Sequence, residues 1–488
     1  MTKYRLAQSN PKGVVLRAPY ALLVITPAEL LYCARSRIVY TLENFMEQRV
    51  NTVRASSTVD KPTAINLIVG MTLWMSLSVL VVQLFSVDAG FDFAQLYRLL
   101  ALSGLSATAW HFVFFWLGER AMQSRFIYLS TAALLIPAFA MVWLLMHPPL
   151  SYSALQWLAV ACGFGGAQFI AFTRNDKIDK TGLGWTLAVN AGIAGIGIVI
   201  AQAALPFLSS INLFGALAGT PWVSTHGSGD IVGVIAPGAS LWLANMGWII
   251  IAAIALASII WHVARRTQHD QAKPFGTITD RTHYRAILRN KHTWVMTLLY
   301  VMAFGSFIGF TITFPLSLQN FSATYTPSAL TYAWIGPLLG VLARPFGGWL
   351  ADLFGGSKVT LWCAVVLAIS SVVAGVITYK ATHSPLPEQW FLGYLLVFLV
   401  IFIATGAASS AIFRSVSVVL PLEQLPLALR WLTAVASAGA AYIPALWYVN
   451  STTATPAYAL FVFALFYVAC VALVAYMYLR NKAEFYNP

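Results

Sequence analysis

Very few ionisable side chains lie within the long apolar stretches of this sequence of 488 residues. Arg344 lies deep inside the stretch 328–352, and His111 lies past the middle of 93–118. Arg414 stands in the second half of another stretch. A charge among apolar residues is costly unless it is paired, hydrated or used. These positions are therefore the first candidates for a functional site.

The residue types favour an anion as the ligand. An arginine side chain presents N–H donors in a planar fork that matches planar oxyanions. No acidic residue lies in the interior of the apolar stretches, so a cation site or a carboxylate proton relay is a poor fit. His111 is the one residue near the centre of a stretch whose type changes charge near neutral pH.

Structural roles stay open for each of these residues at this stage. Arg344 could clamp backbone carbonyls of a loop. Arg414 lies close to Pro421 and could extend to the membrane surface, or it could add positive charge near the site. His111 could be a hydrogen-bonding residue between two helices.

The composition requires a membrane environment. Apolar residues make up 59% of the chain and charged residues 9%, and the mean hydropathy is +0.74, whereas a soluble domain carries about 25% charged residues. A helix needs about 20 apolar residues to cross a bilayer. Twelve such stretches are present: 64–86, 93–118, 125–146, 152–173, 182–207, 239–262, 293–316, 328–352, 357–379, 389–415, 428–448 and 455–479. Because they are continuously apolar rather than alternating, they predict an all-α integral membrane protein of about twelve transmembrane helices.

The net charge of +13 follows this topology. Lys and Arg residues gather before the first stretch, between the sixth and the seventh, and in the loops 119–125 and 174–182. The alternate loops carry few cations and hold Asp88, Asp92 and Asp230. Positive loops mark the cytoplasmic side, which predicts cytoplasmic termini and a multi-pass protein of the plasma (inner) membrane. A nucleic-acid partner is not needed to explain the charge.

The sequence lacks the motifs of several other classes of protein. The four cysteines are scattered, with no metal-ligand spacing, so we expect no disulfide framework, metal or cofactor. The sequence has neither a Walker-type GxxxxGK[ST] run nor a nucleophile elbow, so an enzyme is not indicated. The first apolar run, 14–33, is interrupted by Arg17 and two prolines. No cleavage site follows it, so we expect no signal peptide.

The order of the stretches predicts four parts. Residues 1–62 form a basic cytoplasmic extension, which could include an interfacial helix, and 63–262 form a first six-helix bundle. Residues 263–292 form a basic cytoplasmic linker, and 293–488 form a second six-helix bundle. Two parallel six-helix repeats are typical of membrane carriers.

Internal similarity supports the two repeats. The second stretch ends with H-F-V-F-F-W-L-G-E from His111 to Glu119, and the eighth ends with R-P-F-G-G-W-L-A-D from Arg344 to Asp352. The Trp-Leu pair and the acidic residue have the same offsets in both. We therefore treat His111 and Arg344 as counterparts across a pseudo-twofold axis.

A run G-x-x-x-D-x-x-G-x-x-K follows in the same region and contains Asp352, Gly355 and Lys358. It resembles the cytoplasmic-loop signature of the major facilitator superfamily, which implies the major facilitator fold of two six-helix bundles. The acid can bond helix N-termini and a nearby basic residue, and so hold one access state. The corresponding loop 119–125 lacks most of the pattern, which predicts a weak or asymmetric latch.

Two segments of the second half resemble the nitrate/nitrite porters of this superfamily (NarK-like). They are H-T-W-V-M-T-L-L-Y-V-M-A-F-G-S-F-I-G-F at 292–310 and G-P-L-L-G-V-L-A-R-P-F-G-G at 336–348. Weaker similarity extends over most of 64–480. In that family, arginines on helices two and eight clamp the anion, and phenylalanines on helices four and ten pack on its faces.

The resemblance assigns roles to residues of this chain. It implies that Arg344 is the helix-eight arginine and that Tyr300 on helix seven reaches the anion. It implies that Phe169 and Phe413 are the phenylalanines of helices four and ten. Because nitrate is flat and weakly hydrated, ring packing together with a bidentate fork suits it.

The departures from the family lie mainly in the first half. His111 stands where the family has its helix-two arginine. Helix five keeps Asn190 and Gly192, but its second asparagine is Gly195. The glycine-rich signature of helix eleven is reduced to small residues around Gly439. We expect Asn190 to face the substrate and the glycines to let helices approach and rock.

The sequence thus predicts a secondary active transporter of nitrate and nitrite that works by alternating access. It would exchange the two anions or import nitrate with protons for nitrate assimilation. The expected partners are the anion, protons in the second case, and the lipid bilayer, and the expected state is a monomer. We hypothesise that His111 takes up a proton with the anion, so that affinity falls as pH rises. A carrier of another small inorganic anion and a transport-incompetent sensor or assembly protein remain alternatives.

Overall fold

The computed structural model describes residues 61–173, 183–225, 238–267, 281–321, 329–421, 423–453 and 457–488. Nearly all of the predicted N-terminal extension and the middle of the predicted linker (268–280) lie outside the described residues. The chain divides into two compact units, 1–55 and 56–488. Everything below concerns the second unit.

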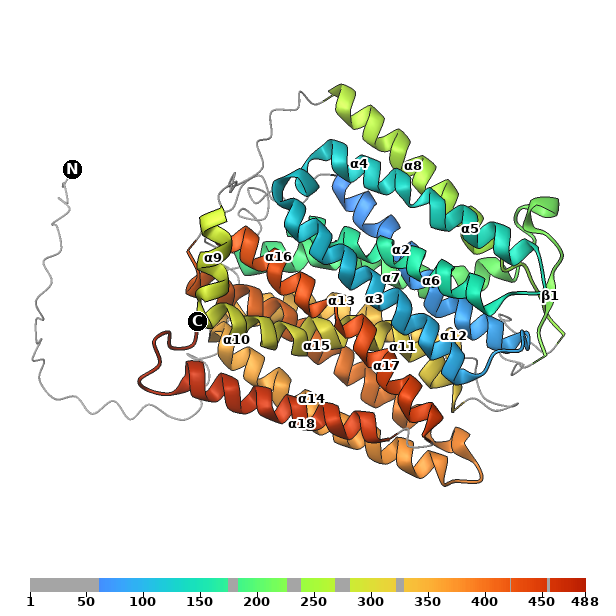
Figure 1. Ribbon diagram of the computed structural model, residues 1–488. Coiled ribbons are helices and arrows are strands. Elements are labelled where there is room, and N and C mark those ends of the chain that lie inside the picture. The colour runs from blue at the N-terminus through green and yellow to red at the C-terminus, as the bar shows by residue number, and fades with distance from the viewer. Residues whose placement is uncertain are drawn as a thin grey trace, which may run out of the picture. The chain divides into compact units, whose positions relative to one another are not determined.

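The described part of the chain is almost entirely helical (Figure 1). The first group of elements is α2 (Lys61–Ser86), α3 (Phe93–Leu117), η1 (Gly118–Met122), α4 (Ser124–Ala133), α5 (Leu135–Met146), α6 (Tyr152–Ala167), η2 (Gln168–Thr173), α7 (Leu183–Ser209), η3 (Gly215–Ala218), β1 (Trp222–Val223), β2 (Ser240–Leu241) and α8 (Asn245–Thr267). The short strands β1 and β2 pair antiparallel, with Trp222 opposite Leu241.

The second group begins with a short helix in the basic linker. Its elements are α9 (Arg281–Arg289), α10 (Lys291–Tyr300), η4 (Val301–Gly305), α11 (Ser306–Gln319), α12 (Ala329–Ala333), α13 (Ile335–Phe354), α14 (Gly356–Thr382), η5 (Pro387–Trp390), α15 (Phe391–Val419), α16 (Leu425–Ala436), α17 (Gly439–Thr452), α18 (Tyr458–Val474) and η6 (Ala475–Leu479). In Figure 1, α9 and the last residue lie at one end of the helices and β1 lies at the other. We name these the α9 end and the β1 end.

Eleven helical segments among the described residues are long and apolar enough to cross a membrane. They match every predicted stretch except the eighth, 328–352. That stretch is also helical, as α12 and α13, but its glycines, its prolines and the charges of Arg344 and Asp352 lower its mean hydropathy. The prediction of an all-α membrane fold is confirmed.

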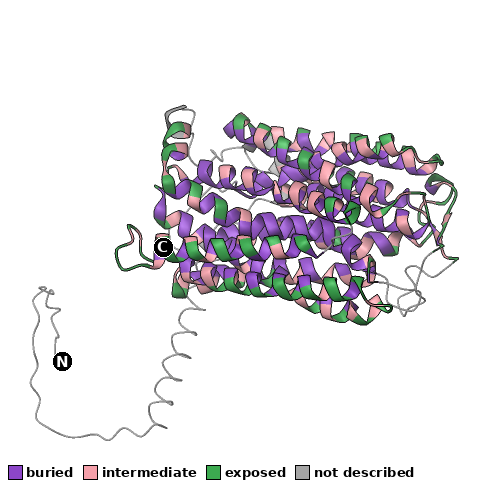
Figure 2. Ribbon diagram, turned by 60° about the horizontal axis from the view of Figure 1, so that its bottom comes forward, coloured by how far each residue is buried: buried purple, intermediate pink, exposed green. Residues whose placement is uncertain are grey.

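The outer faces of the helices carry large apolar side chains. Trp157 is 75% exposed, Ile136 72% and Leu465 71%. In Figure 2 the exposed residues lie on the outward faces of the helices, and the buried residues lie between them. An apolar surface of this kind is stable in lipid rather than in water. The protein is therefore a multi-pass membrane protein.

Two close helix pairs join the first group to the second. Helix α3 packs along α17, and α7 packs along α13. A Cβ on Gly104 of α3 would collide with the backbone carbonyl of Ala440 of α17, so small residues set this approach. A third contact is polar, because Gln202 of α7 donates a hydrogen bond of 2.8 Å to the backbone carbonyl of Thr311 of α11.

Three helices change their winding close to one another. Helix α6 continues as the 3-10 segment η2, and α10 continues into α11 through the π-helical segment η4. Helices α16 and α17 are separated by Ser437 and Ala438. Segments η2 and η4 both pack against α16. Local departures of this kind often occur at functional sites, and here they surround the candidate site.

Candidate functional site

Arg344 lies near the middle of α13 and is only 1% exposed. Its guanidinium carbon is 4.8 Å from the ring centroid of Phe307, 5.6 Å from that of Phe304 and 6.0 Å from that of Phe169. Among the described residues, neither its Nε nor its Nη1 has a hydrogen-bond partner. A buried charge needs a partner to offset its desolvation, and aromatic faces supply only part of it. The site is suited to an anion.

Small residues on α13 and α15 set the depth of Arg344. A Cβ on Gly347 would collide with the backbone of Ala407, and a Cβ on Gly406 would collide with the carbonyl of Gly340. The two helices therefore approach closely on both sides of Arg344. The arginine is held in the interior of the helix group, where it cannot extend to water.

Five aromatic side chains contact one another beside Arg344, and a sixth, Phe307, lies against the guanidinium itself; we name these six the aromatic cage. Its members are Phe169, Phe172, Tyr300, Phe304, Phe307 and Phe413. Phe169 stacks on Phe304 with ring centroids 4.6 Å apart. Phe172 stacks on Phe413 at 5.5 Å. Tyr300 lies 5.3 Å from each of the rings of Phe304 and Phe413, so it connects the two stacks.

The cage contains three residues that the sequence resemblance implied: Tyr300, Phe169 and Phe413. It also contains three that sequence reasoning missed: Phe172, Phe304 and Phe307. Phe304 and Phe307 lie inside the segment 292–310 that resembles the porters. Phenylalanine is common in membrane helices, so these two residues gave no signal of a site. Phe169 and Phe413 share no ring contact in the described structure, because each stacks on a different partner.

Tyr300 is the last residue of α10 and is fully buried. Its hydroxyl group lies beside Arg344 and Thr433, yet it forms no well-aligned hydrogen bond among the described residues. Together with Arg344, it offers several donors that lack acceptors. An anion in the cage would satisfy these donors.

His111 lies on α3 and is buried, with 1% exposure. Its Nδ1 is 2.8 Å from the carbonyl oxygen of Ala107, one turn earlier, to which it donates a hydrogen bond. Among the described residues, its Nε2 has no partner. The structure records no contact between His111 and Arg344 or the cage. The role of His111 as counterpart of Arg344 stays a prediction.

The other predicted residues lie at helix contacts. Asn190 is fully buried in α7. A Cβ on Gly195 would collide with Val341 of α13, and a Cβ on Gly192 would come within 3.9 Å of the carbonyl of the same residue. A Cβ on Gly439 of α17 would collide with η4. The glycines of α7 thus face α13 just before Arg344.

Asp352 ends the segment that carries Arg344, and it binds Arg414 of α15. Arg414 Nε is 3.3 Å from Asp352 Oδ1, and the two side chains are 34% and 10% exposed. The charge of Arg414 is therefore balanced by an acid instead of being available to the cage. Gly355, next in the motif, has a φ of 89°, a conformation that strongly favours glycine. The backbone N–H of Lys358 donates to Asn487.

A further buried arginine was overlooked in the sequence. Arg430 on α16 is 6% exposed, and it lies three residues before Thr433, so the two share a helix face. Its neighbour Trp431 packs edge-on against Phe112 of α3 and Trp294 of α10. Arg430 lies within the predicted stretch 428–448, so a charge inside an apolar stretch was the feature that could have identified it.

No site for a metal is found in the part of the chain that the structure describes, since no three His, Cys, Asp or Glu side chains gather there.

A cavity of about 600 Å³ lies between α3, α11, α14, α15 and α17, and residues such as Tyr97, Asn320 and Tyr394 line it. None of the cage residues belongs to this lining. Among the described residues, the groups suited to binding an anion are therefore Arg344 and the cage.

These features define an α-helical, multi-pass membrane protein with one deeply buried arginine beside stacked aromatic rings. No protein-family model matches the chain. It is 29% identical over 433 residues to the probable nitrate/nitrite antiporter NarK2 of Thermus thermophilus, covering 86% of this chain and 92% of the relative. It is 28% identical over 447 residues to the nitrate/nitrite transporter NarU of Escherichia coli, covering 85% and 90%.

A third relative is the nitrite extrusion protein of Bacillus subtilis, which is 25% identical over 306 residues. The resemblance to the nitrate/nitrite porters is thus confirmed over most of the chain. All three relatives are named for transport and none for an enzymatic reaction, in agreement with the prediction of a transporter.

Proposed function

We propose that this protein is a secondary active transporter of nitrate and nitrite in the plasma (inner) membrane. The observation that carries the proposal is Arg344, a buried guanidinium whose Nε and Nη1 lack partners among the described residues. The names of the relatives support the choice of substrate.

The shape of the cage supports a flat, weakly hydrated anion. Stacked rings such as Phe169 and Phe304 present flat aromatic faces, and a planar ligand can pack against such a face once the two rings separate. The guanidinium of Arg344 can then donate two parallel hydrogen bonds to two oxygens. A strongly hydrated anion would lose more on entering a site with so few polar groups.

We infer that transport is nitrate/nitrite exchange. The cage residues include no acid, so the charge of Arg344 stays uncompensated when the site is empty. Moving an empty site through the closed state is therefore costly, whereas moving it with an anion is not. Proton-linked uptake is the second possibility, and it is favoured by the unpartnered Nε2 of His111.

We propose that the two six-helix groups rock against each other around the cage. The cage contains rings from both groups, because Phe169 and Phe172 belong to η2 and the others belong to α10, η4, α11 and α15. The ion pair of Asp352 and Arg414 joins α13 to α15 near the α9 end. It would hold the second group rigid while the first group moves.

A counterflow assay with purified protein in liposomes tests the proposal. Labelled nitrate should enter vesicles loaded with nitrite, and Arg344→Lys should reduce the initial rate by a factor of about 100 or more, because a lysine cannot reproduce the bidentate fork. Arg98→Lys, the same change at an exposed position of α3, should keep wild-type activity.

Other outcomes would identify the alternatives. Competition by chlorate, formate or chloride at lower concentrations than nitrate would identify another small anion as the substrate. Nitrate binding without counterflow would indicate a sensor or assembly protein with a carrier fold. Equal activity of Arg344→Lys and the wild type would contradict the role of Arg344.

A further inference from the structure

The segment 480–488 folds back onto the α9 end and connects several helix ends. The amide of Asn487 donates a hydrogen bond of 2.6 Å to the carbonyl of Phe354, the last residue of α13. Its side-chain oxygen accepts a hydrogen bond of 3.1 Å from the backbone N–H of Lys358 on α14. The carbonyl of Pro488 accepts bonds from the N–H of Ser357 at 3.2 Å and from the hydroxyl of Ser415 on α15 at 3.0 Å.

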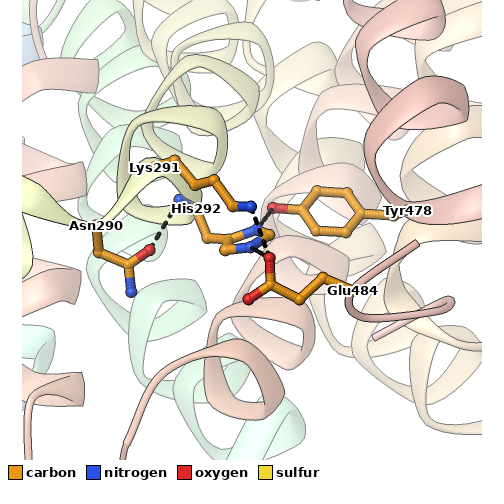
Figure 3. A network of polar contacts seen from close by, with 5 residues as sticks. All are labelled: Asn290, Lys291, His292, Tyr478 and Glu484. Carbon is orange, nitrogen blue, oxygen red and sulfur yellow. Dashed lines mark hydrogen bonds and ion pairs between the residues drawn. The ribbon is translucent and has the colours of Figure 1, made fainter. Parts of the chain in front are cut away.

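The same segment also binds the start of α10 (Figure 3). Glu484 Oε2 is 2.6 Å from Lys291 Nζ and 3.2 Å from His292 Nε2. The other ring nitrogen of His292 is 3.1 Å from the hydroxyl of Tyr478. Asn290 caps α10 by accepting the N–H of His292 at 2.9 Å. His292 is 3% exposed, whereas the side chain of Glu484 is 55% exposed, so the contact lies where a buried ring meets the surface.

The two helices that the segment connects are those that carry the site. Tyr300 lies eight residues after His292 on α10, or about 12 Å along the helix axis. Arg344 lies on α13, whose last residue binds Asn487. Directly after Tyr300 the chain becomes π-helical over Val301–Gly305, a local departure that is often found at functional positions. The cage and the anchor that Glu484 provides thus lie at opposite ends of α10.

We propose that Glu484 and Asn487 are positioning residues, which hold α10 and α13 in register so that Tyr300 stays beside Arg344. This inference rests on the proposed function, because the register matters for anion binding. Neither residue touches the cage. The segment acts through the two helices, at the membrane face that the α9 end meets.

The carboxylate of Glu484 is the centre of this contact. Hydrogen bonds from Lys291 and His292 lower the pKa of Glu484, so the carboxylate stays ionised near neutral pH. An ionised acceptor forms stronger hydrogen bonds than a neutral amide does. The substitution Glu484→Gln therefore weakens the contact with α10 and keeps the size of the side chain.

The test compares Glu484→Gln with the wild type in nitrate counterflow. We expect the KM of Glu484→Gln to exceed that of the wild type by a factor of about five, the effect of one typical hydrogen bond, with kcat changed less than twofold or so. Glu388→Gln, the same change in η5, should follow the wild type.

Hydrogen–deuterium exchange provides a readout that needs no transport. Glu484→Gln should speed exchange in the amides of α10, while α14 keeps its protection because Asn487 still binds it. If exchange changes as expected but no nitrate is transported by the wild type, the anchor stands and the proposed function is wrong. If nitrate is transported, and Glu484→Gln has the wild-type KM and the wild-type exchange, the anchor is wrong. A lower melting temperature with unchanged KM would also contradict it.

Discussion

Helices α13 and α3 are predicted counterparts in the two halves of the chain, but they present different chemistry. Arg344 on α13 is a permanent charge beside aromatic rings, and its Nε and Nη1 have no hydrogen-bond partner among the described residues. His111 on α3 is a conditional charge, and its recorded hydrogen bond goes to its own helix. The first group contributes rings to the cage through Phe169 and Phe172, whereas the second contributes both rings and charge.

This difference suggests that the charge and the ring stacks have separate roles. In the proposed transport cycle, the charge that would attract the anion stays with one group of helices. The ring contacts Phe169–Phe304 and Phe172–Phe413 join the two groups, so they would break and form again in the proposed rocking motion. We therefore expect the charge to determine whether an anion binds and the stacks to determine how the closed state is stabilised. Substitutions can test the two roles separately.

The largest effect is expected when the permanent charge is removed. Arg344→Gln should reduce counterflow by a factor of about 100 or more, because one buried charge–anion contact is lost. The same variant should melt at a higher temperature than the wild type in the absence of anion, because an uncompensated buried charge destabilises the folded protein. Nitrate should stabilise the wild type and leave Arg344→Gln unchanged in a thermal unfolding assay. A loss of stability together with activity would instead identify Arg344 as a structural clamp.

Much of the fold, and the position of Arg344, could be predicted from the sequence. Apolar length alone predicts the helices, and α13 could be placed even though its glycines and charges lower its hydropathy. Arg344 could be identified because a charge among apolar residues is conspicuous. Phe172, Phe304 and Phe307 could not be identified, since a phenylalanine looks the same in sequence whether it faces lipid or the cage. The contacts of 480–488 follow no pattern of spacing, and they depend on how the helix ends meet in three dimensions.

The second prediction concerns a substitution that gives α3 the same permanent charge as α13. His111→Arg gives α3 a permanent charge, and if α3 faces the anion, nitrate affinity should rise by a factor of about ten, the effect of one charge-assisted hydrogen bond. If protonation of His111 accompanies binding, the wild-type affinity should fall as pH rises from 5.5 to 8.5, whereas the variant should not change. Binding measured by isothermal calorimetry over this range decides the point. Identical flat profiles for both proteins would remove His111 from the site.

The smallest effect is expected from the stacks. Phe172→Ala and Phe304→Ala each remove one partner of a contact between the groups, and an aromatic pair contributes about 0.5–1.5 kcal/mol beyond burial. Each should therefore raise KM by a factor of about two to ten, and their effects should be similar although they lie in different groups. Phe139→Ala, at an exposed ring of α5, is the matched control and should leave KM unchanged. Both substitutions weaken the same closed state, one from each helix group. A large rise in KM for Phe304→Ala alone would therefore mean that the second group binds the anion without the first. In that case the first group would act only as a cover, and the functional asymmetry would be greater than the loss of one arginine implies.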